Sequence, residues 1–146
     1  MTSVKQLAKR KLSEFHRWCR VANLFHEPTE SFDNWLVPLL DYDPEEYRDR
    51  KHDWQREAPE EVNEIIKAVN SIPYHRQRAI LIMCYIATDT IRPSEQYQRI
   101  GIKSSTYSTD KNKALQVFAE QYRGGALLQY LEADTVKPWC QQVKKA

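Results

Sequence analysis

Apolar residues recur at helical spacing along most of the chain, most clearly between Ser104 and Tyr122. In this stretch the apolar positions fall on one helical face: Tyr107, Ala114, Leu115, Phe118, Ala119 and Tyr122. At about 100° per residue, the opposite face is polar, mostly small, and ends in cations: Ser105, Thr106, Thr109, Asn112, Lys113 and Gln116. The pattern predicts a long helix with one buried face and one polar face.

A shorter helix is predicted directly before it, with Pro93 at its first position and Ile100 near its end. Gly101 then allows the positive φ of a tight turn, and Ile102 is expected to fill the core between the two helices. Helix, glycine turn and helix form the helix-turn-helix pattern. A polar outer face after such a turn is typical of a helix that enters a DNA major groove, although a plain helical hairpin with a solvated surface also fits.

At the amino terminus, the pattern predicts a helix from Val4 to about Asn23. Residues 1–20 hold six bases and one acid, so this helix either touches phosphate groups as a basic arm or presents a solvated face. Residues 31–40 are apolar and aromatic and predict a short helix that is broken or kinked at Pro38. This segment either packs on the first helix or serves self-association.

Two helices are predicted in the middle of the chain. One restarts at Ala58 and stops near residues 71–73, because the residue before a proline leaves the α region. The next starts there, and its apolar body runs to Ile86. Its first turns carry Arg76 and Arg78, which either bind phosphate or are solvated.

Together these segments predict an all-α fold, with an N-terminal helical arm and a C-terminal helix-turn-helix domain. Only three glycines and few β-branched alternations favour helices over strands. We expect residues 1–57 to form a helical region with a charged linker, and residues 58–146 to form the DNA-binding domain. Gly124 and Gly125 end the long helix, and residues 126–133 predict a last short helix.

Composition narrows the class of protein. Hydrophobic residues make up 41% of the 146 residues, which suffices for a core. We expect no membrane partner, because no run is long and apolar enough to span a bilayer. The first residues carry no secretory signal. Cys19, Cys84 and Cys140 are far apart and predict neither a disulfide framework nor a zinc site, which fits a reducing cytoplasm.

The net charge of +2 hides an uneven distribution. Residues 41–61 hold nine acids and four bases, whereas residues 74–123 hold eight bases and four acids. The carboxylates of the acidic segment lack the spacing and the glycine of a calcium-binding loop. We therefore expect a solvated, charged stretch there rather than a metal site.

Motifs for catalysis are lacking in the sequence. The three glycines form no phosphate-binding loop, and neither H-E-x-x-H nor G-x-S-x-G occurs. We expect no enzyme activity and no cofactor.

The segment from Gly101 to Leu115 resembles the second half of the helix-turn-helix in the ArpU family of phage transcriptional regulators. It is more distantly similar to the last DNA-binding region of σ factors. The most specific matches are Gly101-Ile102, Ser105-Thr106-Tyr107 and Lys113-Ala114-Leu115. Residues 71–86 are also similar to these families, in which a Leu-Pro or Ile-Pro step opens a helix with basic residues near its start. The resemblance covers roughly residues 60–123.

Two positions depart from the family pattern. Lys103 stands where these families usually place a Ser or Thr N-cap, and Ser104 offers an alternative cap. Asp110 stands where they usually have an apolar or basic residue. A carboxylate near DNA repels phosphate.

The resemblance implies a sequence-specific DNA-binding regulator of transcription, encoded by a phage or prophage and activating late genes. In the σ-like register, the residues that face base edges are Ser104, Ser105, Ser108 and Thr109. Those that face phosphates are Lys103, Thr106, Asn112, Lys113, Arg76 and Arg78. Double-stranded DNA is the expected partner, and a homodimer would read paired half-sites.

Two other functions stay open. In the first, the chain is a protein-binding module that docks on bacterial RNA polymerase or another protein, and the contact is formed by residues 41–61, Trp35 and Trp54. Alternatively, it is a phage DNA-packaging subunit of the small-terminase kind, since these subunits also use helix-turn-helix domains.

Overall fold

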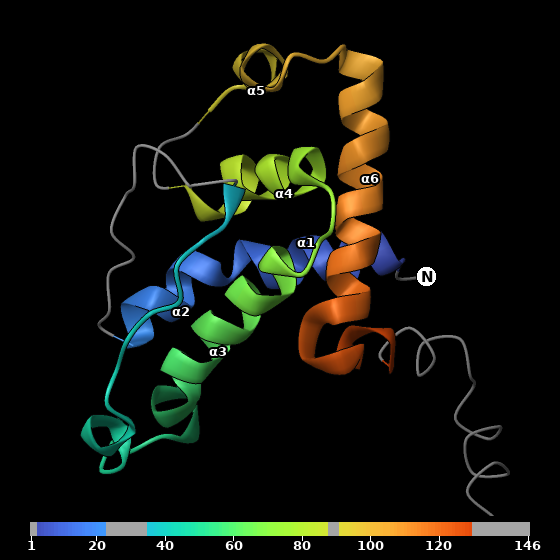
Figure 1. Ribbon diagram of the computed structural model, residues 1–146. Coiled ribbons are helices and arrows are strands. Elements are labelled where there is room, and N and C mark those ends of the chain that lie inside the picture. Colours follow the sequence, from blue (N-terminus) through green and yellow to red (C-terminus); the bar gives the residue numbers. More distant parts are fainter. Residues whose placement is uncertain (1–2, 23–34, 88–90, 130–146) are drawn as a thin grey trace, which may run out of the picture.

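The computed structural model describes residues 3–22, 35–87 and 91–129, and this part of the chain is helical without a strand (Figure 1). The α-helices are α1 (Val4–Ser13), α2 (Phe15–Ala22), α3 (Asp53–Asn70), α4 (His75–Leu81), α5 (Pro93–Ile100) and α6 (Ser104–Gln121). Shorter turns are η2 (Pro44–Tyr47), the π-helical η3 (Ile82–Ile86) and η4 (Tyr122–Gly124). The predicted all-α class is confirmed.

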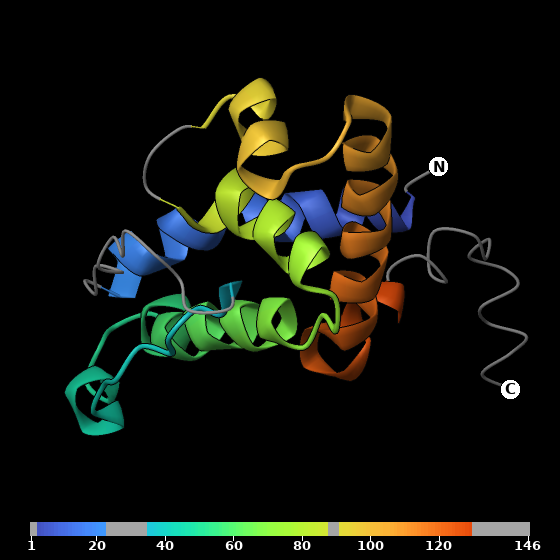
Figure 2. The same cartoon turned by 45° about the horizontal axis from the view of Figure 1, so that its top comes forward.

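The long helix α6 stands along one edge of the molecule, with α5 beside its amino-terminal end (Figures 1 and 2). α1 and α4 pack against α6, and α2 packs against α3. One hydrophobic cluster joins these layers and includes Leu12, Phe15, Ile65 and Phe118, all fully buried. Burying a side chain of this size contributes about 1.5–3 kcal/mol. Described residues from both sides of position 57 thus share one core.

The helix predicted from Val4 onward is interrupted at Glu14. The backbone N–H of Glu14 donates to Lys11 C=O at 3.1 Å, so the chain tightens into a 3₁₀-like turn between α1 and α2. The Glu14 carboxylate accepts from Trp18 Nε1 at 2.9 Å and from Lys11 Nζ at 3.2 Å. The prediction of one continuous helix is therefore wrong at this position. Asn23, its predicted end, lies outside the described residues.

Residues 36–40 are not helical, which contradicts the short helix predicted within 31–40; residues 31–34 lie outside the described part. Two asparagines of α3 hold this segment by its backbone. Asn70 accepts from Val37 N–H and donates to Val37 C=O, both at 2.9 Å. Asn63 does the same with Leu40 at 2.8 and 2.9 Å. Seven helical residues rise about 10.5 Å and three extended ones about 10 Å, so the two spacings match.

The middle helix begins earlier than predicted. α3 starts at Asp53, upstream of Ala58, and includes Pro59 in its interior. His52 N–H donates to Gln55 Oε1 at 3.1 Å, which satisfies one backbone donor at the start of the helix. Proline therefore does not mark the start of this helix.

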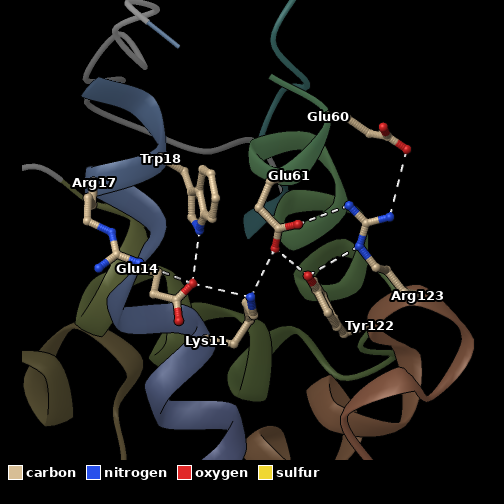
Figure 3. Close-up of polar contacts among 8 residues, drawn as sticks. All are labelled: Lys11, Glu14, Arg17, Trp18, Glu60, Glu61, Tyr122 and Arg123. Carbon is tan, nitrogen blue, oxygen red and sulfur yellow. Dashed lines mark hydrogen bonds and ion pairs between the residues drawn. The ribbon is translucent and has the colours of Figure 1, made fainter. Parts of the chain in front are cut away.

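A buried carboxylate on α3 connects three parts of the chain (Figure 3). Tyr122 Oη and Arg123 Nη2 donate to Glu61, the latter at 2.9 Å, and Lys11 Nζ lies 3.3 Å from Glu61 Oε1. Lys11 belongs to α1, whereas Tyr122 and Arg123 directly follow α6. The side chain of Glu61 is only 10% exposed. These four residues, here called the Glu61 cluster, tie α1 and the end of α6 to α3.

Ionisation of the Glu61 cluster follows from its contacts. Burial by itself would raise the pKa of Glu61, but hydrogen bonds from Tyr122 and Arg123 and the charges of Lys11 and Arg123 outweigh burial and lower this pKa. Burial, together with the hydrogen bond to Glu61, raises the pKa of Tyr122 to about 12. At neutral pH the cluster therefore combines an ionised carboxylate with a protonated phenol.

Replacing Glu61 by Gln is expected to lower the free energy of unfolding by about 2–3 kcal/mol, because Lys11 and Arg123 lose their counter-charge in a largely buried site. Urea unfolding at neutral pH, followed by circular dichroism, measures this loss. Glu57→Gln, at an exposed position of the same helix, is the matched control. Equal stability of the two variants would contradict a structural role for the Glu61 cluster.

The same substitution gives a pH signature. Since folding lowers the pKa of Glu61, its contribution is complete above the unfolded value of about 4.3 and is lost as the pH falls through the folded value. The stability difference between wild type and Glu61→Gln should be constant from about pH 5 to pH 7 and shrink below about pH 4. Unfolding titrations at several pH values test this, and a difference that stays constant in acid would refute it.

Candidate nucleic-acid interface

The turn between α5 and α6 is built on Gly101. Its φ of +78° confirms the left-handed conformation predicted there. The backbone N–H groups of Gly101 and Ile102 both donate to Tyr97 C=O, at 2.8 and 3.0 Å. Lys103 occupies the N-cap of α6 and Ser104 is the first helical residue. Ile102 is only half-buried and lies outside the core cluster, so it does not fill the core as expected.

A buried polar network holds α5 against α6. Tyr107 Oη donates to Gln96 Oε1 at 2.7 Å, and Gln96 Nε2 donates to Ile91 C=O at 2.9 Å. The thiol of Cys84 lies 3.4 Å from Gln96 Oε1 and 3.2 Å from Tyr107 Oη. The rings of Tyr97 and Tyr107 meet edge to face at 4.7 Å. The orientation of α5 therefore depends on hydrogen bonds as well as on packing.

The protonation state of Tyr107 suits this role. Burial and the hydrogen bond with Cys84 raise the pKa of Tyr107 above its ordinary value. Its hydroxyl remains a donor to Gln96 over the whole neutral range. Neither Gln96 nor Cys84 belongs to a recognisable sequence motif, so their role in positioning α5 was not predicted.

The two faces of α6 are as predicted. The buried residues recur at helical spacing: Tyr107, Asp110, Ala114, Leu115, Phe118 and Ala119. The residues predicted to face base edges, Ser104, Ser105, Ser108 and Thr109, are all exposed. Thr109 Oγ1 donates to Ser105 C=O at 3.1 Å, which orients its hydroxyl along the helix. The outer face thus presents small hydroxyl side chains in successive turns.

Most residues predicted to face phosphates also lie at the surface. Lys103, Asn112 and Lys113 are exposed, and Thr106 is half-exposed. Lys113 lies beside the start of α4, in a groove that it shares with Tyr74 and Arg76. A second groove, between α5, the Gly101 turn and α6, is also lined by Lys103 and Arg76. The two grooves adjoin at Arg76, so cationic side chains follow one flank of α6.

Arg76 is paired with Asp110, one of the two residues that differ from the pattern of the ArpU family. Arg76 Nε lies 2.5 Å from Asp110 Oδ2, and half of the Arg76 side chain remains exposed. The Asp110 side chain is only 8% exposed. The carboxylate therefore faces α4 instead of the outer surface, and it links α4 to the middle of α6.

Arg78 does not belong to the candidate interface. It is 7% exposed, and its guanidinium donates to Trp35 C=O at 3.2 Å and to Ile72 C=O at 2.5 Å. The expected phosphate contact of Arg78 is contradicted by this burial. The physical reason is that Arg78 donates to the carbonyl groups of Trp35 and Ile72, which both lie outside the α-helices.

The residues considered for protein binding lie elsewhere. Trp54 is 49% exposed and stacks on His52 at 5.5 Å. Leu36 and Leu39 are also exposed, on the segment held by Asn63 and Asn70. Trp35 is half-buried and packs against the core cluster. The structure therefore places only one of the two predicted tryptophans at the surface.

Comparisons with protein-family models, curated proteins and solved structures gave no match. Among the residues that the structure describes, no group of three or more His, Cys, Asp or Glu side chains is placed to hold a metal ion. None of the described helices is long and apolar enough to cross a membrane.

Replacing Tyr107 by Phe is expected to lower stability by about 1 kcal/mol and to loosen α5, because Gln96 Oε1 loses its strongest donor. Hydrogen exchange of the α5 amides, together with urea unfolding, measures both effects. Tyr97→Phe is the matched control, since it removes a hydroxyl from a half-buried ring next to Tyr107. If the α5 amides are equally protected from exchange in both variants, the network does not position this helix.

Proposed function

We propose that this chain is a sequence-specific DNA-binding regulator of transcription, with α6 entering the major groove of double-stranded DNA. The observation that carries the proposal is the charge of the outer face of α6. Between Lys103 and Gln116 the only acidic residue is Asp110, which is buried against Arg76. This leaves a polar surface without exposed carboxylates, flanked by cations, as binding to a polyanion requires.

The chemistry of the face indicates how bases would be read. A major groove is about 12 Å wide and admits one helix. Serine and threonine hydroxyls both donate and accept hydrogen bonds, so Ser104, Ser105, Ser108 and Thr109 tolerate several bases. Each contact should contribute only about 1 kcal/mol. Specificity would therefore arise from several modest contacts together.

Affinity would come mainly from the flanking residues. Lys103 and Lys113 lie at the two ends of the readout turns and would contact phosphates, with Thr106 and Asn112 as neutral donors. Arg76 keeps half of its side chain exposed and would add a weaker contact, because Asp110 already offsets its charge. Phosphate contacts of this kind fix the register of the helix in the groove.

The biological setting is proposed from the ArpU resemblance alone. It suggests a phage or prophage regulator that activates late genes in the cytoplasm of a bacterial host. A homodimer would read two half-sites about one turn of DNA apart.

A protein-docking function is the second candidate. Trp54, Leu36 and Leu39 expose large apolar side chains. Trp54 lies within the acidic segment 41–61, and the two leucines directly precede this segment in the sequence. Such a surface suits a partner with basic and apolar side chains. RNA polymerase is the partner that the σ-like resemblance suggests. Retention of polymerase by a chain that retains no duplex DNA would favour this function over DNA readout.

Replacing Lys113 by Ala is expected to weaken binding to all duplex sequences similarly. The slope of log K against log salt concentration should become shallower by about 0.9, because one phosphate contact is lost. Fluorescence anisotropy with labelled duplexes at several salt concentrations measures both quantities. Lys67→Ala is the control. It removes an exposed lysine of α3, and this lysine pairs with Glu64. An unchanged affinity and slope for Lys113→Ala would show that α6 is placed wrongly on the DNA.

A further inference from the structure

We propose that the first turn of α1 is a second DNA-contacting element, and that the groove between it and α6 binds the sugar-phosphate backbone of the same duplex. This inference rests on the proposed function and extends it to a part of the chain outside the helix-turn-helix. The groove is lined by Lys5 at the start of α1, Tyr74 and Gln77 around the start of α4, and Asn112, Lys113 and Gln116 of α6.

The start of α1 is held in place beside α6. Ser3 Oγ accepts from Gln6 N–H at 3.2 Å, and Gln6 Oε1 accepts from Ser3 N–H at 2.9 Å. This capping box orders the first turn, while Leu7, Ala8 and Leu12 are buried. α1 crosses α6 in both views of the molecule (Figures 1 and 2). Lys5 is therefore carried on an ordered helix rather than on a free arm.

The groove is chemically suited to an anionic chain. Among the described residues that line it, the cations are Lys5 and Lys113, and there is no carboxylate. Tyr74, which is 66% exposed, and the amides of Asn112 and Gln116 add neutral donors. Val4 and Val117 supply apolar surface, against which the C–H faces of deoxyribose rings can pack.

The position along α6 also fits the DNA backbone. From Ser105, within the readout turns, to Gln116 the helix rises about 16 Å. This distance exceeds the major-groove width of about 12 Å. With the amino-terminal turns of α6 in the groove, the turn around Gln116 lies at or beyond the groove edge, where one strand's phosphates run. Lys5 and Lys113 would then contact that strand from two helices.

The test compares two variants of the full chain that remove the same charge from different sides of α1. Lys5→Ala is expected to weaken binding to a labelled duplex about three- to tenfold at about 0.1 M salt, and to make the salt slope shallower by about 0.9. Arg10→Ala, at an exposed position on the other side of α1, should change affinity less than twofold. The double variant Lys5→Ala/Lys113→Ala should lose nearly two units of slope.

The outcomes separate this inference from the proposed function. If wild type binds duplex DNA and Lys113→Ala weakens it, but Lys5→Ala behaves like Arg10→Ala, the groove is not a backbone site and only the inference fails. If wild type does not bind duplex DNA, both fail. If inorganic phosphate at matched ionic strength abolishes the effect of Lys5→Ala, the groove holds a free anion, and the inference is again overturned.

Discussion

The arrangement of the helices depends on one buried carboxylate, Glu61. Taking an ionised group out of water is unfavourable unless its partners surround it. Glu61 finds them on two distant segments, Lys11 of α1 and the Tyr122–Arg123 pair after α6. Shifting either helix relative to α3 would leave a charge buried without its partner. A protein in which apolar side chains replace the whole cluster need not be less stable. We therefore infer that the Glu61 cluster fixes the relative positions of the helices as much as it stabilises the fold.

The two halves of α6 are held in different ways. The carboxyl-terminal half of α6 packs in the core, whereas its amino-terminal half is attached by polar contacts: Asp110 to Arg76, and Tyr107 to Gln96 and Cys84. These contacts leave the outer face of the amino-terminal half exposed. Packing in the core brings α1, an element far away in sequence, beside the same helix. The proposed DNA surface is thus assembled from α6, the start of α4 and the start of α1.

Periodicity predicted what depends on local sequence. The two faces of α6, the positive φ of Gly101 and the all-α class follow from spacing, from the conformational freedom of glycine and from the scarcity of breakers. One wrong prediction involves a partner distant in sequence. Arg78 carries a charge that normally lies at the surface, yet the carbonyl groups of Trp35 and Ile72 accept hydrogen bonds from it inside the protein.

The segment at residues 36–40 gives the same lesson from the backbone. Its apolar pattern predicts a helix. However, the peptide groups of Leu40 and Val37 bond to the side chains of Asn63 and Asn70, and not to other peptide groups as in a helix. Such side-chain partners compete with helical hydrogen bonds. DNA recognition by the exposed serines and threonines of α6 likewise depends on a partner, the DNA, and the spacing of residues in the sequence does not reveal it.

The most direct test of the central claim is selection of binding sites from a randomised duplex library by the full chain, followed by anisotropy on the enriched sequence. The account predicts an enriched motif that is bound tightly and in a salt-dependent manner, and a triple variant, Ser105→Ala/Thr109→Ala/Lys113→Ala, that is folded but no longer prefers it. No enrichment at low salt, or an unchanged preference in the triple variant, would contradict α6 as the DNA-reading helix.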